Sequence, residues 1–197
     1  MRAVMATVPP ELLDWRRRTG ADRYDEMWNG DLHMAPTPNR DHQELAGHLW
    51  NWLRQHCAQP GGNRVDPPRN VASVGGWPHD FRIPDVVLLT PDRLELDRNE
   101  YIEGPPAVVV EVRSPGDETY EKLSFYAALG VPEVWIVDRD SKQPQVHVLG
   151  EGDYTLQPAD AHGWTPSPAT AVRLRPEGGK LAVQLGDDGA TKRLLPE

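Results

Sequence analysis

One glutamate stands alone inside a run of apolar residues. Glu111 interrupts the segment AVVVEV at residues 107–112, where every neighbour favours burial. A buried carboxylate is costly unless it is paired, protonated or bound to a cation. Arg113, two residues on, shares one face of the expected strand and offers an ion-pair partner. Taken alone, the residues therefore favour a structural Glu111–Arg113 pair and a functional carboxylate equally.

A second carboxylate precedes another apolar run. Asp85 follows Pro84 and leads into VVLL at residues 86–89. If this run and the run at 107–112 pair as neighbouring strands, Asp85 and Glu111 project at the same end of the sheet. Two close carboxylates repel unless they share a proton or a divalent cation, and oxygen ligands with open positions suit Mg²⁺ or Mn²⁺. The structural alternative is that Asp85 only hydrogen-bonds a turn at the start of its strand.

Lys122 is the candidate cationic group. It lies on an expected helix, three residues before Phe125 and seven before Leu129, on a largely apolar face. A lysine in this position either extends its ammonium to solvent or points it at a carboxylate cluster. In a hydrolysis reaction the ammonium would orient the attacking water and stabilise negative charge that develops on a phosphate.

Two further candidates lie earlier in the chain. Glu26, four residues before Gly30, would add a metal ligand or activate water, and is otherwise an exposed strand carboxylate. His42 would act as a general base or hydrogen-bond a phosphate, and is otherwise a satisfied histidine at the edge of the core. The remaining histidines form no metal-ligand spacing, and the single cysteine, Cys57, excludes a cysteine-rich zinc site.

The elements expected to position these residues alternate between helices and strands. In chain order they are a helix ending near Gly20, a hairpin at 24–34 around Asn29-Gly30, a helix capped by Asn39 or Asp41 and running to about Cys57, strands at 86–89 and 107–112, a helix from Ser114 to Leu129, and strands at 134–137 and 145–149. Continuous apolar runs indicate central strands covered on both faces. The pattern predicts an α/β fold with a central mixed β-sheet flanked by helices.

Length and composition are typical of one soluble domain. The chain has 197 residues, of which 38% are hydrophobic and 26% charged. We expect a core over about residues 8–150, further C-terminal strands over 151–186, and a disordered tail over 187–197. A single cysteine, and the lack of a signal peptide or membrane-spanning run, predict a cytoplasmic protein that does not bind membranes.

The formal net charge of −9 limits the classes of function. Phosphate binding depends largely on lysine and arginine, so this charge argues against tight, non-specific coating of DNA. A bound divalent cation would offset carboxylates at a local site without requiring a basic surface. The sequence also contains no phosphate-binding loop, dinucleotide fingerprint or GxSxG motif, which removes support for those enzyme classes.

Several motifs occur in an order that resembles one known family. They are YDEMWNG at 24–30, His42 at a helix start, IPDVV at 83–87, VVEVRSP at 109–115, Glu121-Lys122 with Tyr126, and GVPEVWIVD at 130–138. Together they resemble the Uma-type restriction endonuclease family, which belongs to the PD-(D/E)XK nuclease superfamily. The resemblance covers roughly residues 8–150, and its most specific part runs from Val109 to Asp138.

This resemblance implies a restriction-endonuclease-like fold and a metal-dependent endonuclease, with DNA favoured over RNA as the substrate. It assigns Asp85 and Glu111 as ligands of Mg²⁺, with Mn²⁺ able to substitute, and Lys122 as the motif lysine. Glu26 resembles the acidic residue near the family's N-terminus, and His42 resembles the histidine at its helix start. Cutting two strands requires two sites, so a homodimer is considered, with the helix around Trp50 and Trp52 as its interface.

Two alternatives remain open from the sequence. The first is a non-catalytic interaction module that keeps the nuclease fold, in which Arg113 pairs with Glu111 in place of a metal ion. The second is a metal-dependent hydrolase that acts on a smaller phosphate ester, which the acidic composition would suit better than a polyanion.

Overall fold

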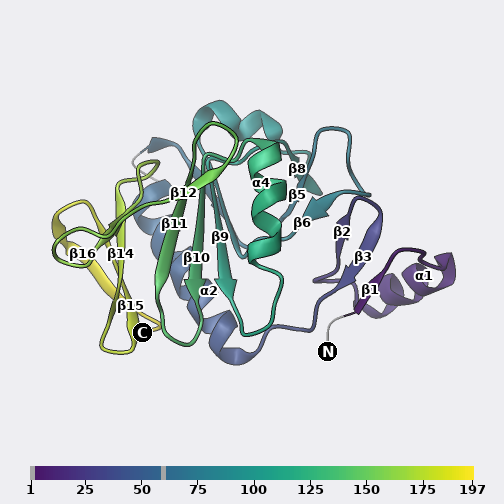
Figure 1. The fold of residues 1–197 in the computed structure, drawn as a ribbon, viewed down its shortest axis with the longest axis horizontal. Helices are drawn as coiled ribbons and strands as arrows, with labels where there is room; N and C mark the ends of the chain where they lie inside the picture. The colour runs from purple at the N-terminus through teal and green to yellow at the C-terminus, as the bar shows by residue number, and fades with distance from the viewer. Residues whose placement is uncertain (1–2, 59–60) are drawn as a thin grey trace.

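A six-stranded mixed sheet forms the centre of the molecule (Figure 1). The computed structural model describes residues 3–58 and 61–197. The strands of the central sheet, in spatial order, are β12 (Tyr154–Leu156), β11 (Pro144–Leu149), β10 (Glu133–Asp138), β9 (Val108–Arg113), β7 (Val86–Leu89) and β4 (Arg64–Asp66). β9 and β10 are parallel, and the other neighbours are antiparallel. The predicted central mixed sheet, with the runs at 86–89 and 107–112 as neighbours, is confirmed.

Helices cover both faces of this sheet. α4 (Leu123–Leu129) packs on the face that carries Val109 and Ile136. α2 (Arg40–Leu53) packs on the opposite face, against Val108 and Val110 (Figure 1). Every residue of β7 is buried, as expected for a strand covered on both sides. Within the described ranges, no helix is long and apolar enough to cross a membrane.

The N-terminus of α2 is fixed by a side-chain cap. The Asn39 side chain accepts a hydrogen bond from the backbone N–H of His42 at 3.0 Å, which satisfies one donor of the first turn. Leu45, Leu49 and Leu53 recur at helical spacing and are buried. The chain continues into a π-helical turn over Arg54–Ala58, so the helical segment reaches the expected region near Cys57.

The two tryptophans of α2 both make intramolecular hydrogen bonds. Trp52 is buried and donates from its indole nitrogen to the carbonyl of Thr191 at 2.9 Å. Trp50 donates to the carbonyl of Val65 at 3.1 Å and packs against the core cluster. Trp52 is therefore unavailable to a partner, whereas Trp50 is only half-buried, and the helix around Trp50 and Trp52 as a dimer interface stays a prediction.

A second sheet carries the N-terminal hairpin. Its strands, in spatial order, are β1 (Ala3–Met5), β3 (Asp31–Met34), β2 (Glu26–Trp28), β6 (Phe81–Arg82), β5 (Asn70–Ala72) and β8 (Tyr101–Glu103). Asn29 and Gly30 both have positive φ, 51° and 95°, as the tight turn between β2 and β3 requires. α1 (Pro10–Thr19) ends at Gly20 in the left-handed conformation, as expected. A 3₁₀ segment, Pro91–Leu96, precedes β8.

The helix expected from Ser114 to Leu129 begins later. Its first turn is the 3₁₀ segment Tyr120–Lys122, which leads directly into α4, and the helix ends at Gly130 as expected. Residues 114–119 form a loop in which the Asp117 carboxylate accepts from the backbone N–H groups of Ser114 and Thr119. Gly116 has a φ of 75°, which is incompatible with a right-handed helix. The Ser-Pro pair therefore opens a turn rather than the helix itself.

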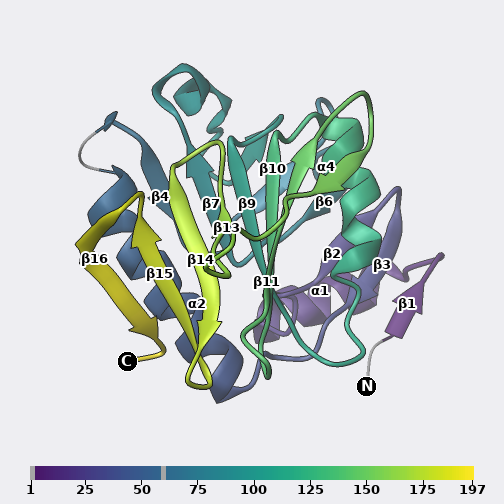
Figure 2. The ribbon, with the colours of Figure 1, turned by 60° about the vertical axis from the view of Figure 1, so that its left-hand side comes forward.

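The C-terminal residues form a third, antiparallel sheet. Its strands are β13 (Thr165–Pro166), β14 (Val172–Glu177), β15 (Lys180–Leu185) and β16 (Asp188–Leu195). The expectation of a disordered tail over 187–197 is wrong, because β16 pairs with β15 and Leu195 is buried. This sheet lies beside α2 (Figure 2), and Leu174 and Leu181 join the same core cluster as Leu45. We propose on this basis that the chain is one domain.

Candidate active site

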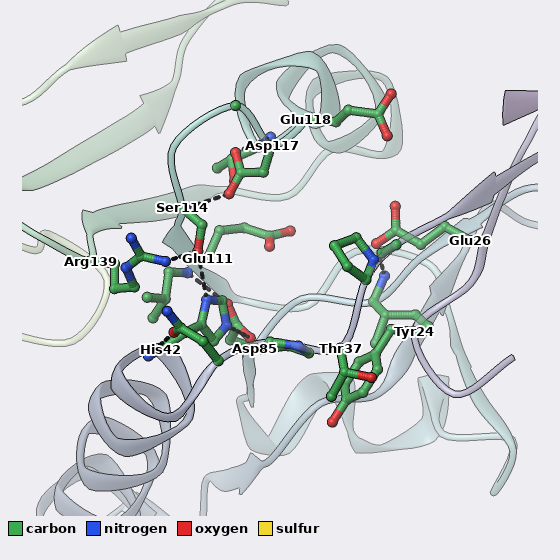
Figure 3. Close-up of a pocket in the computed structure, with 18 of the residues that line it drawn as sticks. Tyr24, Glu26, Thr37, His42, Asp85, Glu111, Ser114, Asp117, Glu118 and Arg139 are labelled. Carbon is green, nitrogen blue, oxygen red and sulfur yellow. Dashed lines mark hydrogen bonds and ion pairs between the residues drawn. The ribbon is translucent and has the colours of Figure 1, made fainter. Parts of the chain in front are cut away.

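The pocket that contains all five predicted residues has a volume of about 490 Å³. It lies where the second half of β9 faces the start of α2 and the hairpin of β2 and β3 (Figure 3). The predicted residues in its wall are Glu26, His42, Asp85, Glu111 and Lys122. Residues separated by up to 96 positions in the chain therefore meet in one place, and their mutual contacts decide what chemistry the pocket supports.

Asp85 is attached to β9 on both sides of Glu111. Its backbone N–H donates to the carbonyl of Val110 at 2.9 Å, and its side chain accepts from the N–H of Val112 at 2.7 Å. The backbone bond lies next to the last β7–β9 pair, Val86 and Val110, and the side-chain bond reaches further along β9. Asp85 is thus held beside Glu111 by the backbone of the neighbouring strand.

Glu111 is the most buried acid of the pocket, with 4% of its surface exposed. Both of its oxygens accept from the Lys122 ammonium at 3.1 Å, and one also accepts from the hydroxyl of Tyr126 at 2.6 Å. Burial raises the pKa of Glu111 to about 7, and the charges of Asp85 and Glu26 add to the rise while Lys122 and Tyr126 oppose it. This carboxyl group therefore titrates near neutral pH.

Lys122 places its ammonium between two carboxylates. It is the last residue of the 3₁₀ turn that precedes α4, and 12% of its side chain is exposed. The ammonium lies 2.8 Å from Glu26 and 3.1 Å from Glu111. Burial alone would lower the pKa of Lys122, but the charges of these two carboxylates outweigh it and raise that pKa. Lys122 is therefore a permanent cation of the pocket and does not extend to solvent.

His42 links Asp85 to the loop after β9. Its Nε2 lies 2.8 Å from an Asp85 oxygen, and its Nδ1 lies 3.3 Å from the Ser114 hydroxyl. Burial lowers the pKa of His42, but the hydrogen bond and charge of Asp85, with the charges of Glu111 and Asp117, leave that pKa raised. An ionised Asp85 can only accept, so Nε2 carries the proton that this bond requires.

Comparison with known proteins identifies the family. A model of the Uma2 family, described as "Putative restriction endonuclease", matches residues 9–183. The chain belongs to the Uma2 family. Membership extends well beyond the region of about 8–150 over which the sequence motifs resemble it, and it supports nuclease function.

A solved crystal structure is among the chains with a similar fold. It is a crystal structure of a "putative nuclease belonging to DUF820" from Anabaena variabilis, which is 16% identical to this chain. The match has a TM-score of 0.58 and covers 74% of this chain and 82% of the other. Together with Uma2 membership, this likeness confirms the predicted restriction-endonuclease-like α/β fold. No curated protein matches the chain.

Arg113 does not pair with Glu111 in this Uma2 chain. Its guanidinium donates to Asp138 at 2.8 Å and lies over the ring of Tyr120, 5.3 Å from the ring centre. The parallel register of β9 and β10 sets Arg113 directly beside Asp138, which decides the choice of partner. The interaction-module alternative included a Glu111–Arg113 pair, and the structure contradicts that pairing.

Three residues at the Uma2 site were absent from the predicted set. Tyr126 donates to Glu111, Ser114 contacts His42, and Arg139 lines the pocket while its guanidinium bonds to Asp140. Tyr126 lies four residues after Lys122, one helical turn, and this spacing could have placed it on the same face. Ser114 and Arg139 carry no such signal, because the fold of two separate loops brings them to the pocket.

Proposed function

We propose that the protein is a divalent-metal-dependent endonuclease that hydrolyses phosphodiester bonds of nucleic acid, with DNA as the favoured substrate. The observation that supports this most directly is the buried Glu111, which shares a pocket with Asp85 and contacts the ammonium of Lys122 at 3.1 Å. These are the groups that a metal-assisted phosphodiester hydrolysis needs: oxygen ligands for a cation and a fixed positive charge beside them.

The donor set suits a hard divalent cation. PD-(D/E)XK-like nucleases generally use divalent metals, and Asp85 and Glu111 are the residues that would hold one here. The pocket brings the three carboxylates of Glu26, Asp85 and Glu111 together with one ammonium, Lys122, so it offers several oxygen ligands to a cation. In the part of the chain that the structure describes, no three acidic, histidine or cysteine side chains already converge on a common metal position. A cation with few protein ligands and several waters, such as Mg²⁺ or Mn²⁺, fits that arrangement.

The roles of the surrounding residues follow from their contacts. A bound cation supplies charge that polarises the phosphate and lowers the pKa of a coordinated water. Lys122 donates hydrogen bonds from a buried position, where it would orient the attacking water and stabilise negative charge on the phosphate. His42 holds one oxygen of Asp85 and the Val112 N–H holds the other, so the Asp85 carboxylate is oriented before any ligand arrives.

A cleavage assay tests this proposal. Supercoiled plasmid, single-stranded DNA and RNA would each be incubated with Mg²⁺, with Mn²⁺ and with EDTA. We expect metal-dependent internal cutting, lost in EDTA, and a rate lower by about 10²–10³-fold in Lys122→Ala. Equal cutting by that variant would contradict the role of Lys122. No cutting of any polymer together with hydrolysis of a small aryl phosphodiester would replace the proposal with a hydrolase of smaller esters.

The assembly state bears on duplex cleavage. One pocket cuts one strand, so a homodimer is an arrangement that would cut both. Sedimentation equilibrium at the protein concentration of the assay would measure this, and a monomer that linearises plasmid only after nicking it would show that single sites act in succession.

Metal affinity is expected to increase with pH between about 6 and 8. The raised pKa of Glu111, about 7, means that a proton competes with the cation for this carboxylate near neutral pH. Binding of Mn²⁺ at pH 7 should therefore release roughly half a proton from Glu111, and almost none at pH 8.5. Calorimetry in buffers with different ionisation enthalpies measures this release. An affinity for Mn²⁺ that does not change over this range would contradict the assignment of Glu111 as a ligand.

A further inference from the structure

The oxygens of Glu26 are already engaged by the fold. One oxygen accepts from the backbone N–H of Ile83 at 2.7 Å and lies 2.8 Å from the Lys122 ammonium. The other oxygen accepts from the indole N–H of Trp28 at 2.8 Å. Two of these three donors belong to the backbone or to a stacked ring, since Trp28 also stacks on His33 at 4.0 Å between ring centres. The Glu26 carboxylate is thus fixed in orientation as well as in position.

Glu111 also has two donors on one oxygen and one on the other, but all of them are side-chain groups of Lys122 and Tyr126. A carboxylate has about four lone-pair sites, two on each oxygen. The oxygen of Glu26 that faces Lys122 already has two donors, so it has no site left for a cation. The remaining site is on the oxygen that Trp28 holds. A backbone N–H and a stacked indole cannot turn away as the side-chain donors of Glu111 can, so Glu26 is a poorer candidate than Glu111 for the metal ligand that the sequence suggested.

Glu26 and Glu111 hold the ammonium from opposite walls of the pocket. In Figure 3 Glu26 extends from the hairpin side and Glu111 from the central sheet. The Lys122–Glu26 distance of 2.8 Å is shorter than the 3.1 Å distances to Glu111. A lysine side chain has four rotatable methylene groups and is costly to hold in one place. A second carboxylate anchor restricts that freedom, whatever else Glu111 binds.

We infer that Glu26 is a positioning residue for the ammonium of Lys122 and not a ligand of the metal ion. The inference rests on the proposed function, because it assigns Glu26 a role in that same site. In this arrangement Asp85 and Glu111 serve the cation, and Glu26 keeps the ammonium in the pocket when the oxygens of Glu111 turn to that cation. Loss of Glu26 therefore lowers the rate of the reaction but does not change the affinity for the metal ion.

The experiment compares Glu26→Gln with Glu118→Gln. Glu118 lines the same pocket and bonds to His33 at 3.0 Å, so its replacement removes one negative charge from a different part of the wall. We expect both variants to bind Mn²⁺ in calorimetry with dissociation constants within about threefold of each other. We expect kcat of Glu26→Gln to fall by about 10–100-fold with KM nearly unchanged. A loss of Mn²⁺ affinity of tenfold or more in Glu26→Gln alone would overturn the inference, because it would make Glu26 a ligand.

A second readout needs neither metal nor activity. Acylation of lysines by an excess of anhydride, followed by mass spectrometry, reports how freely each ammonium reaches the reagent. In the metal-free protein, Lys122 should react at least fivefold faster in Glu26→Gln than in Glu118→Gln, and Glu26→Asp should lie between. Equal labelling of Lys122 in all three variants would overturn the positioning role. If the wild-type protein bound no Mn²⁺ while the variants still showed this labelling difference, the proposed metal dependence would be contradicted. The positioning of Lys122 by Glu26 would remain supported.

Discussion

Replacing Glu111 by glutamine is expected to abolish binding of Mg²⁺ and Mn²⁺ and to lower the rate of cleavage by roughly 10³-fold or more. The amide keeps the size of the side chain and can still accept from Tyr126, which lies 2.6 Å from the carboxylate in the wild type. It removes the negative charge that a divalent cation requires. Calorimetry with Mn²⁺ and a plasmid-cleavage time course would measure the two losses.

A matched control lies on the adjacent strand. Glu133 is a buried carboxylate of β10 that accepts from the Trp135 indole and from the backbone N–H of Ala169 at 3.1 Å. It does not line the pocket, so Glu133→Gln should keep metal binding and cleavage. Circular dichroism would establish that both variants are folded. Metal binding by Glu111→Gln at wild-type affinity would remove Glu111 from the site and with it the proposed mechanism.

Replacing Lys122 by methionine is expected to lower the free energy of unfolding at pH 8 by about 3 kcal/mol, because removing one partner leaves a buried carboxylate uncompensated. The loss should be smaller at pH 5.5. The pKa of Glu111 is raised from 4.5 to about 7 in the folded protein, so the folded state retains its proton more strongly than the unfolded state does. The loss of stability caused by burying an ionised Glu111 is thus absent below about pH 4.5 and reaches its full size above the folded-state pKa of Glu111. Removing Lys122 raises that folded-state pKa further, because Lys122 lowers it in the wild type.

Urea unfolding at the two pH values measures this difference. Lys192, whose ammonium contacts Glu177 at 2.8 Å on the C-terminal sheet, provides the control. It is 31% exposed, so Lys192→Met should cost less than about 1 kcal/mol and should show little change between pH 5.5 and 8. If Lys122→Met lost as much stability at pH 5.5 as at pH 8, the loss would come from packing and not from the charge of Glu111.

The local sequence was sufficient for most of the secondary structure. Asn29-Gly30 specified the hairpin turn, Asn39 or Asp41 the start of α2, and Gly130 the end of α4, and the structure selects Asn39 as the cap. Each of these signals acts through the backbone of its own turn, so the neighbouring residues alone are enough to predict it. The start of the helix that includes α4 was misplaced because the Asp117 side chain takes the backbone N–H groups of Ser114 and Thr119, and because Gly116 has a positive φ.

The sequence by itself identified Glu111, because a lone carboxylate among five apolar neighbours has few physical explanations. It also placed Asp85 beside it through the pairing of two apolar runs, which the structure bears out in β7 and β9. What it left open was the choice of partner for each charge. Arg113 and Lys122 were both available to Glu111, and sequence spacing favoured neither.

Only the tertiary structure decided those partners. The parallel register of β9 and β10 places Arg113 beside Asp138. The packing of α4 on the sheet places the ammonium of Lys122 beside Glu111. Glu26 joins the same ammonium from a hairpin 96 residues earlier than Lys122. Coulomb energies depend on distance through space and on burial, and neither quantity is encoded in local spacing. The identity of the charged residues is therefore a property of the sequence, whereas their pairing is a property of the fold.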